Sequence, residues 1–478
     1  MKILMVGAEA VPFSSSGGLG DVMGSLPAAV KQNMLPEDDI RVILPLHEIT
    51  KMKYMDKLTF VGKINVRLAW RNLYCGIFEC NHNGVIYYFI DNEYYFKRAE
   101  LYGNFDDGEK YAFFCKAVLE VMRYVNYFPD VLHANDWHSA LSIIYLKCYY
   151  ASQEEYRNIK TLYTIHNIEY QGVFDFSIFD DVFDLGGCER ALFDYDGNIN
   201  LTKAAIVCAD KVSTVSERYS EELLYRYFSG NLHHIMQRYS YKLCGIVNGI
   251  DTNYYNPAKD SIIEKKYDCK HLQNKAVCKE AFQKEFGLEV NKNIPIVAVV
   301  SRLASHKGMD LIKCVFNDIC YENLQFVLLG KGEYEYEQFF RNEMNKSRHN
   351  VRIILDYNKD LSRKIYSAAD ILLMPSKSEP CGLSQMIASR YGVVPLVREV
   401  GGLADTIKPY NPFDEDTNGF SFRNYNAHEM LHVLNYALSI YSMKPEWEKL
   451  VKTVMQKDFS WNKSAKKYIN LYSEIIGD

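Results

Sequence analysis

Residues 294–312 read IPIVAVVSRLASHKGMDLI, and this stretch contains the pattern that decides the fold. An aliphatic run at 294–300 is followed by a polar loop and by a second apolar segment that begins near Gly308. A short apolar run bounded by polar turns is typical of a strand that is buried on both faces of a parallel sheet. The stretch therefore predicts a strand, a loop and a helix in succession, which is half of a βαβ unit.

The same strand pattern recurs along the chain in two sets. The first set comprises residues 3–6, 131–133, 161–165, 212–215 and 243–247, and the second comprises 294–300, 326–329, 351–355, 371–374 and 393–397. Amphipathic segments such as 111–124 and 276–286 separate the apolar runs. Two such sets predict an α/β protein with two Rossmann-like, doubly wound domains. We expect the break near NGIDTNYYNP at 248–257, because Asn-Gly and a terminal Pro favour a turn.

The composition favours an ordinary globular protein and argues against two classes of partner. Hydrophobic residues make up 48% and charged residues 24% of the 478 residues, and the formal net charge is -5. A negative balance disfavours nucleic acid as the main ligand, because phosphate backbones bind basic surfaces. No stretch approaches the ~18 consecutive apolar residues of a membrane span. The apolar opening run meets Glu9 too soon for a signal peptide, so a cytoplasmic location is expected.

Twelve cysteines are scattered along the chain without a C-x-x-C pair. This distribution predicts reduced thiols that serve as small core residues rather than disulfides. The neighbouring His233 and His234 lack the further ligands and the spacing that zinc requires. We therefore expect no metal site.

Ligands of open α/β sheets bind beyond the carboxyl ends of the strands, so the residues that follow each strand are candidates for the site. After the strand at 294–300, Arg302 and Lys307 lie on the connection to the helix. Two cations beside a helix N-terminus could hold a diphosphate and stabilise it as it leaves. The alternative is a pair of solvated surface charges.

Two glycine-rich connections are further candidates for a phosphate site. Gly17 and Gly18 precede a helix that is expected to start around Asp21, and Gly401 and Gly402 open another helix. Bare backbone N–H groups at a helix N-terminus favour phosphate. The first loop lacks the dinucleotide G-x-G-x-x-G spacing, which disfavours a nicotinamide enzyme. A tight turn without a ligand is the alternative interpretation of such a loop.

Polar residues at other strand ends suit a sugar ligand. Glu379 and the backbone of 381–383 would offer acceptors and donors to hydroxyl groups. In the first half of the chain, one strand end carries His133, Asp136, Trp137 and His138, and another carries His166 and Asn167. Histidine and asparagine side chains at strand ends could bind sugar hydroxyls. For any single Glu or His of this kind, a solvated loop residue or a structural core residue is the alternative.

Long stretches of the chain closely resemble bacterial glycogen synthases and plant-type starch synthases, in the family's order and nearly from end to end. The matching stretches in the first half are GGLGDVMGSLPAAV at 17–30, DNEYYFKR at 91–98, HANDWHSAL at 133–141 and TIHNIEYQGVF at 164–174. Those in the second half are VNGIDTNYYNP at 247–257, VSRLASHKGMDLI at 300–312, EPCGLSQ at 379–385, YGVVPLVREVGGLADTI at 391–407 and DFSW at 458–461. A resemblance carried by so many long motifs is specific.

The resemblance implies a GT-B fold, in which two Rossmann-like domains face each other across a cleft. It implies an N-terminal domain at 1–247 on the acceptor side, a C-terminal nucleotide-sugar-binding domain at 248–456, and a final helix within 457–478 that crosses back to the N-terminal domain. The implied activity is retaining transfer of glucose from ADP-glucose or UDP-glucose to the non-reducing 4-hydroxyl of an α-1,4-glucan. Partners would be the nucleotide sugar and glycogen, starch or maltooligosaccharide, with no cofactor beyond that co-substrate.

The resemblance also implies roles for individual residues. The implied catalytic residues are Arg302, Lys307, Glu379 and His166. The implied donor-binding residues are Gly17, Gly18, Asn248, Arg302, Lys307, Tyr357, Glu379, Cys381, Gly382, Leu383, Gly401 and Gly402. On the acceptor side the resemblance implies Asp136, His138 and Asn167.

One position departs from the family pattern. The family has Lys-x-Gly-Gly-Leu before the first helix, whereas this chain has Ser-Ser-Gly-Gly-Leu, with Ser15 where the lysine would be. The bacterial-type resemblance favours ADP-glucose, and the missing cation weakens that preference. Two rival interpretations are a transferase of the same fold with another acceptor and a glucan-binding homologue with weak catalysis.

Overall fold

The structure is a computed structural model that describes residues 1–346 and 348–477. It divides into two compact units: unit 1 comprises residues 1–249 and the segment that starts at Trp461, and unit 2 comprises Ile250–Ser460. The chain therefore passes between the units slightly beyond the predicted positions 247 and 456, and Asn248 belongs to unit 1. At the two crossings the N–H of Ile250 donates a hydrogen bond to the carbonyl oxygen of Phe459 at 2.8 Å.

Unit 1 contains a nine-stranded sheet with the strand order β12-β11-β7-β6-β1-β2-β5-β4-β3. Its strands are β1 (Lys2–Val6), β2 (Asp39–Pro45), β3 (Thr59–Leu68), β4 (Arg71–His82), β5 (Val85–Asp91), β6 (Val131–Asn135), β7 (Lys160–Ile165), β11 (Lys211–Thr214) and β12 (Leu243–Gly245). The strands β3, β4 and β5 form an antiparallel meander, and all other neighbours pair in parallel. A small sheet has the order β8-β10-β9, with β8 at Val173–Phe174, β9 at Asp194–Tyr195 and β10 at Asn198–Asn200.

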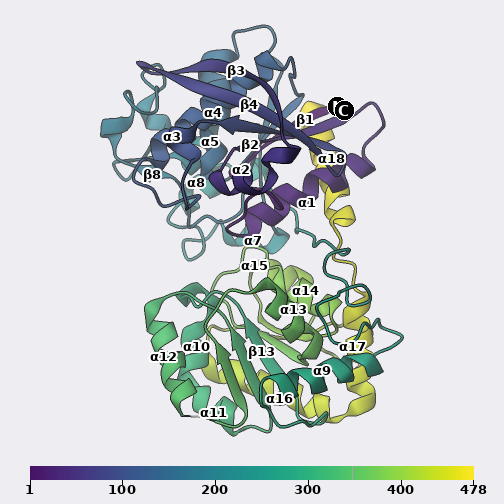
Figure 1. Cartoon of the computed structure of the whole chain (residues 1–478). Helices are drawn as coiled ribbons and strands as arrows, with labels where there is room; N and C mark the ends of the chain where they lie inside the picture. The colour runs from purple at the N-terminus through teal and green to yellow at the C-terminus, as the bar shows by residue number, and fades with distance from the viewer. Residues whose placement is uncertain (347, 478) are drawn as a thin grey trace. The chain divides into compact units, whose positions relative to one another are not determined.

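Side chains of the central strand β1 alternate between two hydrophobic cores, as the geometry of a strand requires. Ile3 and Met5 belong to the core that includes residues of α1 (Gly18–Asn33) and α18 (Trp461–Ile476). Leu4 and Val6 belong to the core that includes residues of α4 (Asp107–Tyr124), α5 (Trp137–Tyr145) and α6 (Leu201–Cys208). The final helix thus packs in unit 1, beside the first helix of the chain (Figure 1).

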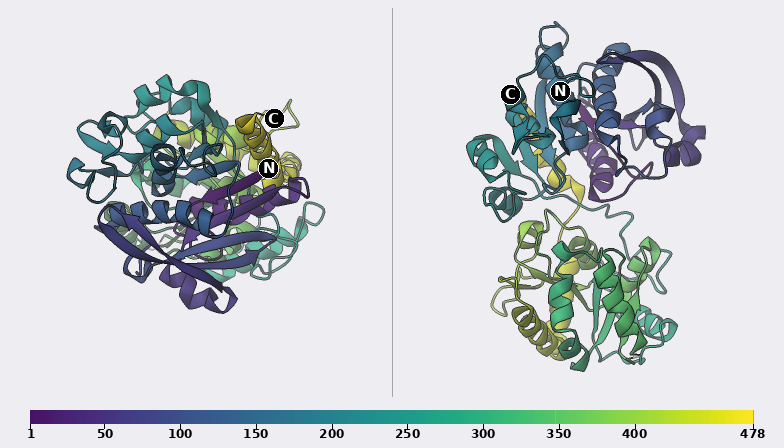
Figure 2. Two further views of the ribbon diagram at one scale, coloured as in Figure 1. Left: turned by 90° about the horizontal axis from the view of Figure 1, so that it is seen from above. Right: turned by 90° about the vertical axis from the view of Figure 1, so that its left-hand side faces the viewer.

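The remaining helical segments of unit 1 are short and lie around this sheet (Figure 2). They are α2 (Glu48–Tyr54), α3 (Glu93–Phe96), α7 (Glu217–Glu222), α8 (His233–Arg238), the 3-10 turns η1 (Met55–Lys57), η3 (Phe176–Ile178), η4 (Arg190–Leu192) and η5 (Ser240–Lys242), and the π-helical segment η2 (Leu146–Tyr150).

Unit 2 contains a six-stranded, fully parallel sheet with the order β15-β14-β13-β16-β17-β18. Its strands are β13 (Ile296–Val300), β14 (Gln325–Leu329), β15 (Val351–Ile354), β16 (Ile371–Met374), β17 (Val394–Arg398) and β18 (Phe420–Phe422). Its helices are α9 (Gln273–Glu285), η6 (Ser305–Lys307), α10 (Met309–Cys314), α11 (Phe316–Tyr321), α12 (Tyr334–Asn345), α13 (Lys359–Ala368), α14 (Ser384–Arg390), α15 (Gly401–Thr406), α16 (Ala427–Ser442) and α17 (Lys444–Gln456). When the six strands of unit 2 are numbered along the chain, their order in the sheet is 3-2-1-4-5-6, which is the Rossmann arrangement.

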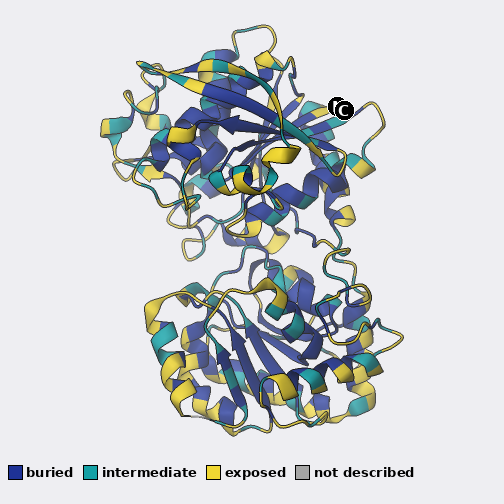
Figure 3. Ribbon diagram, in the orientation of Figure 1, coloured by how far each residue is buried: buried dark blue, intermediate teal, exposed yellow. Residues whose placement is uncertain are grey.

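The strands of both large parallel arrays are buried, and exposure is concentrated on helices and loops (Figure 3). This two-sided burial explains why the parallel strands are readable as continuous apolar runs. By contrast, the strands β2 to β5 were not predicted. The long strand β3 has mostly exposed or half-buried residues, so it contains no such run, whereas β2 and β5 are largely buried apolar runs that the prediction overlooked.

The first helix also differs from its prediction, since it begins at Gly18 rather than around Asp21. No helix within residues 1–346 and 348–477 is long and apolar enough to cross a bilayer.

Candidate functional site

In unit 2 the strand order reverses at β13, which lies between β14 and β16. Ligands of open α/β sheets bind beyond the carboxyl ends of the strands at such a reversal. The connection after β13 carries Arg302 and Lys307, and the connection after β16 carries Glu379. The topology therefore brings the predicted cations and the predicted carboxylate to one edge of the sheet.

Lys307 and Glu379 form an ion pair at this edge. The ammonium group of Lys307 donates to both carboxylate oxygens of Glu379, at 2.8 and 2.7 Å. The hydroxyl of Ser376 donates to the same carboxylate at 3.0 Å. The side chain of Glu379 is only 8% exposed and that of Lys307 is 19% exposed, so water screens this pair weakly. The pair fixes both groups beside the carboxyl ends of β13 and β16.

The two connections that carry the pair pack directly against each other. Gly308 has a φ of 74°, and a Cβ atom there would lie 2.0 Å from the carbonyl oxygen of Pro375. The N–H of Lys377 donates to the carbonyl oxygen of His306 at 2.8 Å. Position 308 requires glycine because it has both a left-handed conformation and no room for a side chain.

Gly401 and Gly402 have a similar packing role against the loop that contains Glu379. A Cβ atom at Gly401 would lie 2.0 Å from the carbonyl oxygen of Glu379, and one at Gly402 would lie 2.2 Å from that of Cys381. The N–H of Gly402 already donates to the carbonyl oxygen of Glu379 at 3.1 Å. These glycines allow close backbone contact, and this accounts for them without a phosphate. Their predicted contact with the donor stays a prediction.

The turn after Glu379 is held from inside unit 2. Gly382 has a φ of 73°, and the amide of Gln385 donates to the carbonyl oxygens of Cys381 at 3.1 Å and Gly382 at 2.9 Å. Leu383 directly precedes α14. Residues 381–383 therefore form a rigid turn beside the carboxylate, at the place where the sequence predicts the sugar.

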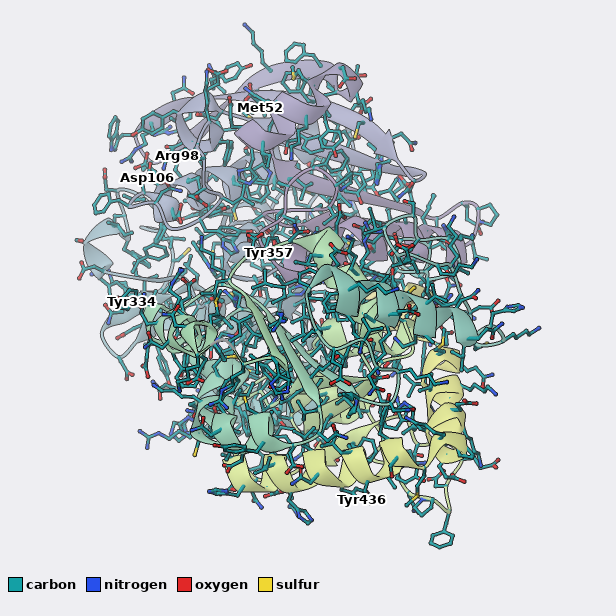
Figure 4. The ribbon with its side chains drawn as sticks, turned by 60° about the horizontal axis from the view of Figure 1, so that its bottom comes forward. Met52, Arg98, Asp106, Tyr334, Tyr357 and Tyr436 are labelled. Atoms are coloured by element: carbon teal, nitrogen blue, oxygen red, sulfur yellow. The ribbon has the colours of Figure 1, made fainter. Side chains whose placement is uncertain are left out.

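Two other predicted donor-binding side chains are exposed. Within the described part of the chain, no hydrogen bond or ion pair involves the Arg302 guanidinium, so this cation is available to a ligand. Tyr357, labelled in Figure 4, lies between β15 and α13 and is 75% exposed. An exposed aromatic ring in this loop is compatible with the predicted stacking on a nucleobase.

The strand order of unit 1 reverses at β1, which lies between β2 and β6. Gly17 and Gly18 follow β1, are exposed, and have open space where a Cβ atom would be. The neighbouring backbone N–H groups of Ser16 and Gly20 donate to the buried carboxylate of Glu9, at 2.6 and 3.0 Å. The glycine-rich loop is thus anchored by a carboxylate, and burial raises the pKa of Glu9.

Asp136 and His166 also lie at this edge, after β6 and β7. A carboxylate oxygen of Asp136 accepts the N–H of His166 at 2.7 Å, and the His166 ring contacts the amide oxygen of Asn135 at 2.9 Å. Burial raises the pKa of Asp136 to about 7 and lowers that of His166 to about 3. At neutral pH the ring of His166 is therefore uncharged. The half-buried Asn167 continues the same loop.

His138 is buried and its Nδ1 has no hydrogen-bond partner among the described residues, so its predicted role on the acceptor side stays a prediction. Its side chain is buried, and its ring lies 4.1 Å from Trp137, 4.5 Å from Tyr102 and 4.7 Å from Tyr111, measured between centroids. This is the environment of a core histidine, and burial lowers its pKa well below the ordinary value. His138 follows Trp137, the first residue of α5, and the sequence at this position gave no sign that the histidine is buried.

Asn248 is buried just before the crossing into unit 2. Its side-chain oxygen has no hydrogen-bond partner among the described residues. A buried acceptor without a partner is unusual, and a ligand would satisfy it.

Comparison with known proteins identifies the family. A profile described as "Starch synthase catalytic domain" matches residues 2–238, and one described as "Glycosyl transferases group 1" matches residues 280–453. A protein named glycogen synthase from Bacillus cereus is 44% identical over 478 residues, which is 100% of both chains. The chain belongs to the glycogen and starch synthase family.

Two further relatives of this synthase support the assignment. A glycogen synthase from Clostridium beijerinckii is 43% identical over 480 residues, and the match covers 100% of both proteins. The catalytic domain of starch synthase IV from Arabidopsis thaliana, solved with ADP and acarbose, matches with a TM-score of 0.89 and 31% identity over 100% of this chain and 99% of that one. The predicted GT-B fold and glucosyltransferase activity in glycogen or starch synthesis are thereby confirmed.

The departure of this synthase from the family pattern lies on an exposed part of the glycine-rich loop. The hydroxyl of Ser15 donates to the carbonyl oxygen of Gly17 at 3.3 Å, and a Cβ atom at Gly20 would lie 2.8 Å from that of Ser15. The serine therefore supports the local turn but adds no charge.

Three residues that hold parts of the candidate site in place were not predicted from the sequence. Glu9 anchors the glycine-rich loop, and Ser376 orients Glu379. Arg398 is buried at the end of β17 and donates to the carbonyl oxygens of Ser376 at 3.3 Å and Lys377 at 2.9 Å. A charged residue at the end of an otherwise apolar run was the available signal for Glu9 and Arg398.

Proposed function

We propose that this synthase uses ADP-glucose as the donor and extends the non-reducing end of an α-1,4-glucan with retention at C1. The support for an adenine nucleotide and a glucan-like ligand is the starch synthase IV structure, which was solved with ADP and acarbose. The support for the polymer is the name glycogen synthase of relatives that match over their full length. UDP-glucose is the alternative donor, because Ser15 removes a family lysine from the glycine-rich loop.

The observation that carries the donor site is the buried Lys307–Glu379 pair beside the exposed Arg302, at the strand reversal of unit 2. Arg302 and Lys307 would bind the diphosphate and stabilise the negative charge that develops as the C1–O bond breaks. Glu379 would accept a hydrogen bond from a glucose hydroxyl, while Lys307 holds its carboxylate in place. In this proposal Arg302 binds the diphosphate, and Lys307 and Glu379 both bind the donor and hold each other in position.

The reaction that we propose is a front-face displacement through an oxocarbenium-like state. The acceptor 4-hydroxyl approaches C1 from the side on which the diphosphate departs, and a phosphate oxygen takes the proton of that hydroxyl. The C1–O bond to the diphosphate breaks as the C1–O bond to the acceptor forms. Neither a covalent nucleophile nor a metal or cofactor is required in this scheme.

The acceptor group of unit 1 would contain Asp136, Asn167 and His166. An uncharged His166 ring does not repel a developing positive charge on the sugar, and Asp136 holds the backbone of His166 through its N–H. Asn248 offers an unpaired acceptor oxygen to a hydroxyl group.

The test is turnover of ADP-glucose and UDP-glucose, measured side by side as nucleotide release on glycogen, maltose and a lipid extract. We expect faster nucleotide release from ADP-glucose than from UDP-glucose. When the glucose of the donor is radiolabelled, we expect the label in glycogen and maltose only. Label in the lipid fraction would support the rival acceptor, and glucan binding without nucleotide release would support the weakly catalytic homologue. Preference for UDP-glucose would contradict the proposed donor.

A further inference from the structure

Trp70 is an exposed aromatic ring of unit 1 that is nevertheless held in one orientation. It lies in the turn between β3 and β4 and is 74% exposed. Its indole N–H donates to a carboxylate oxygen of Asp181 at 2.5 Å, and the guanidinium carbon of Arg71 lies 4.5 Å from the centroid of its ring. Arg71 also donates to the backbone carbonyl oxygen of Asp181 at 2.5 Å and to its carboxylate at 3.2 Å. The ring is therefore fixed by its neighbours while most of its surface faces solvent.

A second exposed ring is joined to Trp70 by a continuous set of contacts. The guanidinium of Arg71 lies 3.3 Å from one carboxylate oxygen of Glu109, and the other oxygen accepts the hydroxyl of Tyr95 at 2.5 Å. The ring of Tyr95 lies 5.0 Å from that of Tyr94, measured between centroids. Tyr94 is 71% exposed. Two exposed rings are thus tied to one set of ion pairs and hydrogen bonds.

Both rings lie at the same edge of the nine-stranded sheet as the acceptor group. The strands β1, β2, β5, β6 and β7 run parallel, so their carboxyl ends share one edge, where Asp136 and His166 follow β6 and β7. The antiparallel strand β4 pairs Gly76 with Asp91, the last residue of β5, so the turn that contains Trp70 projects beyond this edge. The helix α3, which carries the second ring, directly follows β5.

The separation between the rings and the acceptor group sets the size of the ligand. In the sheet, β4 lies four strand positions from β6, which at ~4.8 Å per position is roughly 19 Å. A disaccharide does not span this distance, whereas a glucan chain of several units does. The apolar C–H face of a sugar can stack on an aromatic ring, and its hydroxyl groups can donate to the exposed carboxylate of Asp181.

We propose that Trp70 and Tyr94 form a second glucan site, which binds units of the acceptor chain away from its reacting end. This inference rests on the proposed function, which supplies the polymer. Because Trp70 is fixed before the chain arrives, little side-chain entropy is lost when it binds. The second glucan site increases the affinity for polymeric acceptors and has no effect on maltose, which is too short to reach it.

The test is native electrophoresis of the full-length protein in gels that contain increasing concentrations of glycogen, together with initial rates on glycogen and on maltose. We expect glycogen to retard the wild type. In Trp70→Ala the dissociation constant for glycogen and the KM for glycogen should each rise by about tenfold, because one aromatic contact is lost. The kinetics of Trp70→Ala on maltose should match those of the wild type, which also shows that the variant is folded.

Two further variants complete the experiment. Trp70→Phe keeps an aromatic ring at this position and should recover part of the affinity for glycogen. The matched control is Tyr321→Ala, which removes an 84% exposed ring from unit 2 and should bind glycogen as the wild type does.

Two results would overturn the second glucan site and leave the proposed function intact. One is equal retardation of Trp70→Ala and the wild type by glycogen. The other is a loss of activity on maltose as large as the loss on glycogen, because Trp70 would then support the fold rather than bind the polymer. A wild type that neither is retarded by glycogen nor transfers glucose to it would contradict the polymeric acceptor itself, and the second glucan site with it.

Discussion

At the residue scale, the proposed site gives Lys307 two roles, an ion pair with Glu379 and a contact with the diphosphate, and mutation can separate them. Lys307→Ala leaves the Glu379 carboxylate buried without its cation, so we expect a loss of unfolding free energy on the order of 3 kcal/mol. Turnover should fall by about 10²–10³-fold because a contact with the departing diphosphate is lost. The ion pair therefore predicts that this variant loses stability as well as activity.

The double variant Lys307→Ala/Glu379→Gln removes the unpaired charge, and we expect it to regain much of the stability but none of the activity. Urea denaturation and initial rates check the two outcomes.

Arg302→Ala should keep wild-type stability and lose activity, because its guanidinium has no partner in the described residues. The control is Arg341→Ala, which removes an exposed arginine. Wild-type turnover in Arg302→Ala would refute the assignment of the diphosphate site.

Ser15→Lys should restore the cation that the family has in this loop. Ser15 is exposed, so the longer side chain costs little stability. One added charge-assisted contact to phosphate should lower the KM for the donor by roughly tenfold, with a smaller effect on kcat. Steady-state kinetics of Ser15→Lys and of the control Ser15→Ala measure this. An unchanged KM in the lysine variant would mean that the loop does not contact the donor.

Asp136 should make stability depend on pH. Its pKa is raised from 3.8 to about 7 in the folded protein, so the folded state binds more protons than the unfolded state between these values. Stability from this group is therefore present at low pH and is lost as pH rises from about 4 to 7. The unfolding free energy of wild type relative to Asp136→Asn should fall between pH 5 and pH 8. A difference that rises over this interval would contradict the assigned environment.

At the element scale, α18 is tied to the sheet of unit 1 through His133. The ring of His133 on β6 contacts the Tyr472 hydroxyl at 2.8 Å and the Thr164 hydroxyl at 2.6 Å. Tyr472→Phe leaves a buried ring nitrogen without a partner, so we expect a loss of about 1–3 kcal/mol in unfolding free energy. Denaturation of the exposed-site control Lys463→Ala should match wild type. Equal stability of Tyr472→Phe and wild type would show that this contact contributes nothing.

The strands and the loops that follow them show what could and could not be predicted from the sequence. Most of the parallel strands were predictable because burial on both faces leaves a continuous apolar run, although the buried parallel strand β2 was overlooked. The strand β3 was not predictable, because its mixed exposure leaves no such run, whereas β5 is a buried apolar run that was overlooked. Arg302, Lys307 and Glu379 were found because they follow apolar runs. Glu9 was missed because its role depends on the N–H groups of Ser16 and Gly20, which only the folded loop brings to its carboxylate.

At the scale of the whole molecule, the chain forms two Rossmann-like units, and the candidate site residues of each unit lie at a strand reversal. The prediction of two domains rested on two sets of apolar runs, and it could not locate the crossings to the residue. The reason is physical: Ile250 and Phe459, which lie at the two crossings, are joined by a hydrogen bond although they are far apart in the sequence, and such a contact leaves no local pattern.

The central claim is that Arg302 and Lys307 bind the diphosphate of the donor. A crystal structure of the wild-type synthase with ADP tests this most directly. We predict density for the β-phosphate within hydrogen-bond distance of the Arg302 guanidinium and the Lys307 ammonium. A nucleotide whose phosphates lie away from both of these side chains would contradict the account.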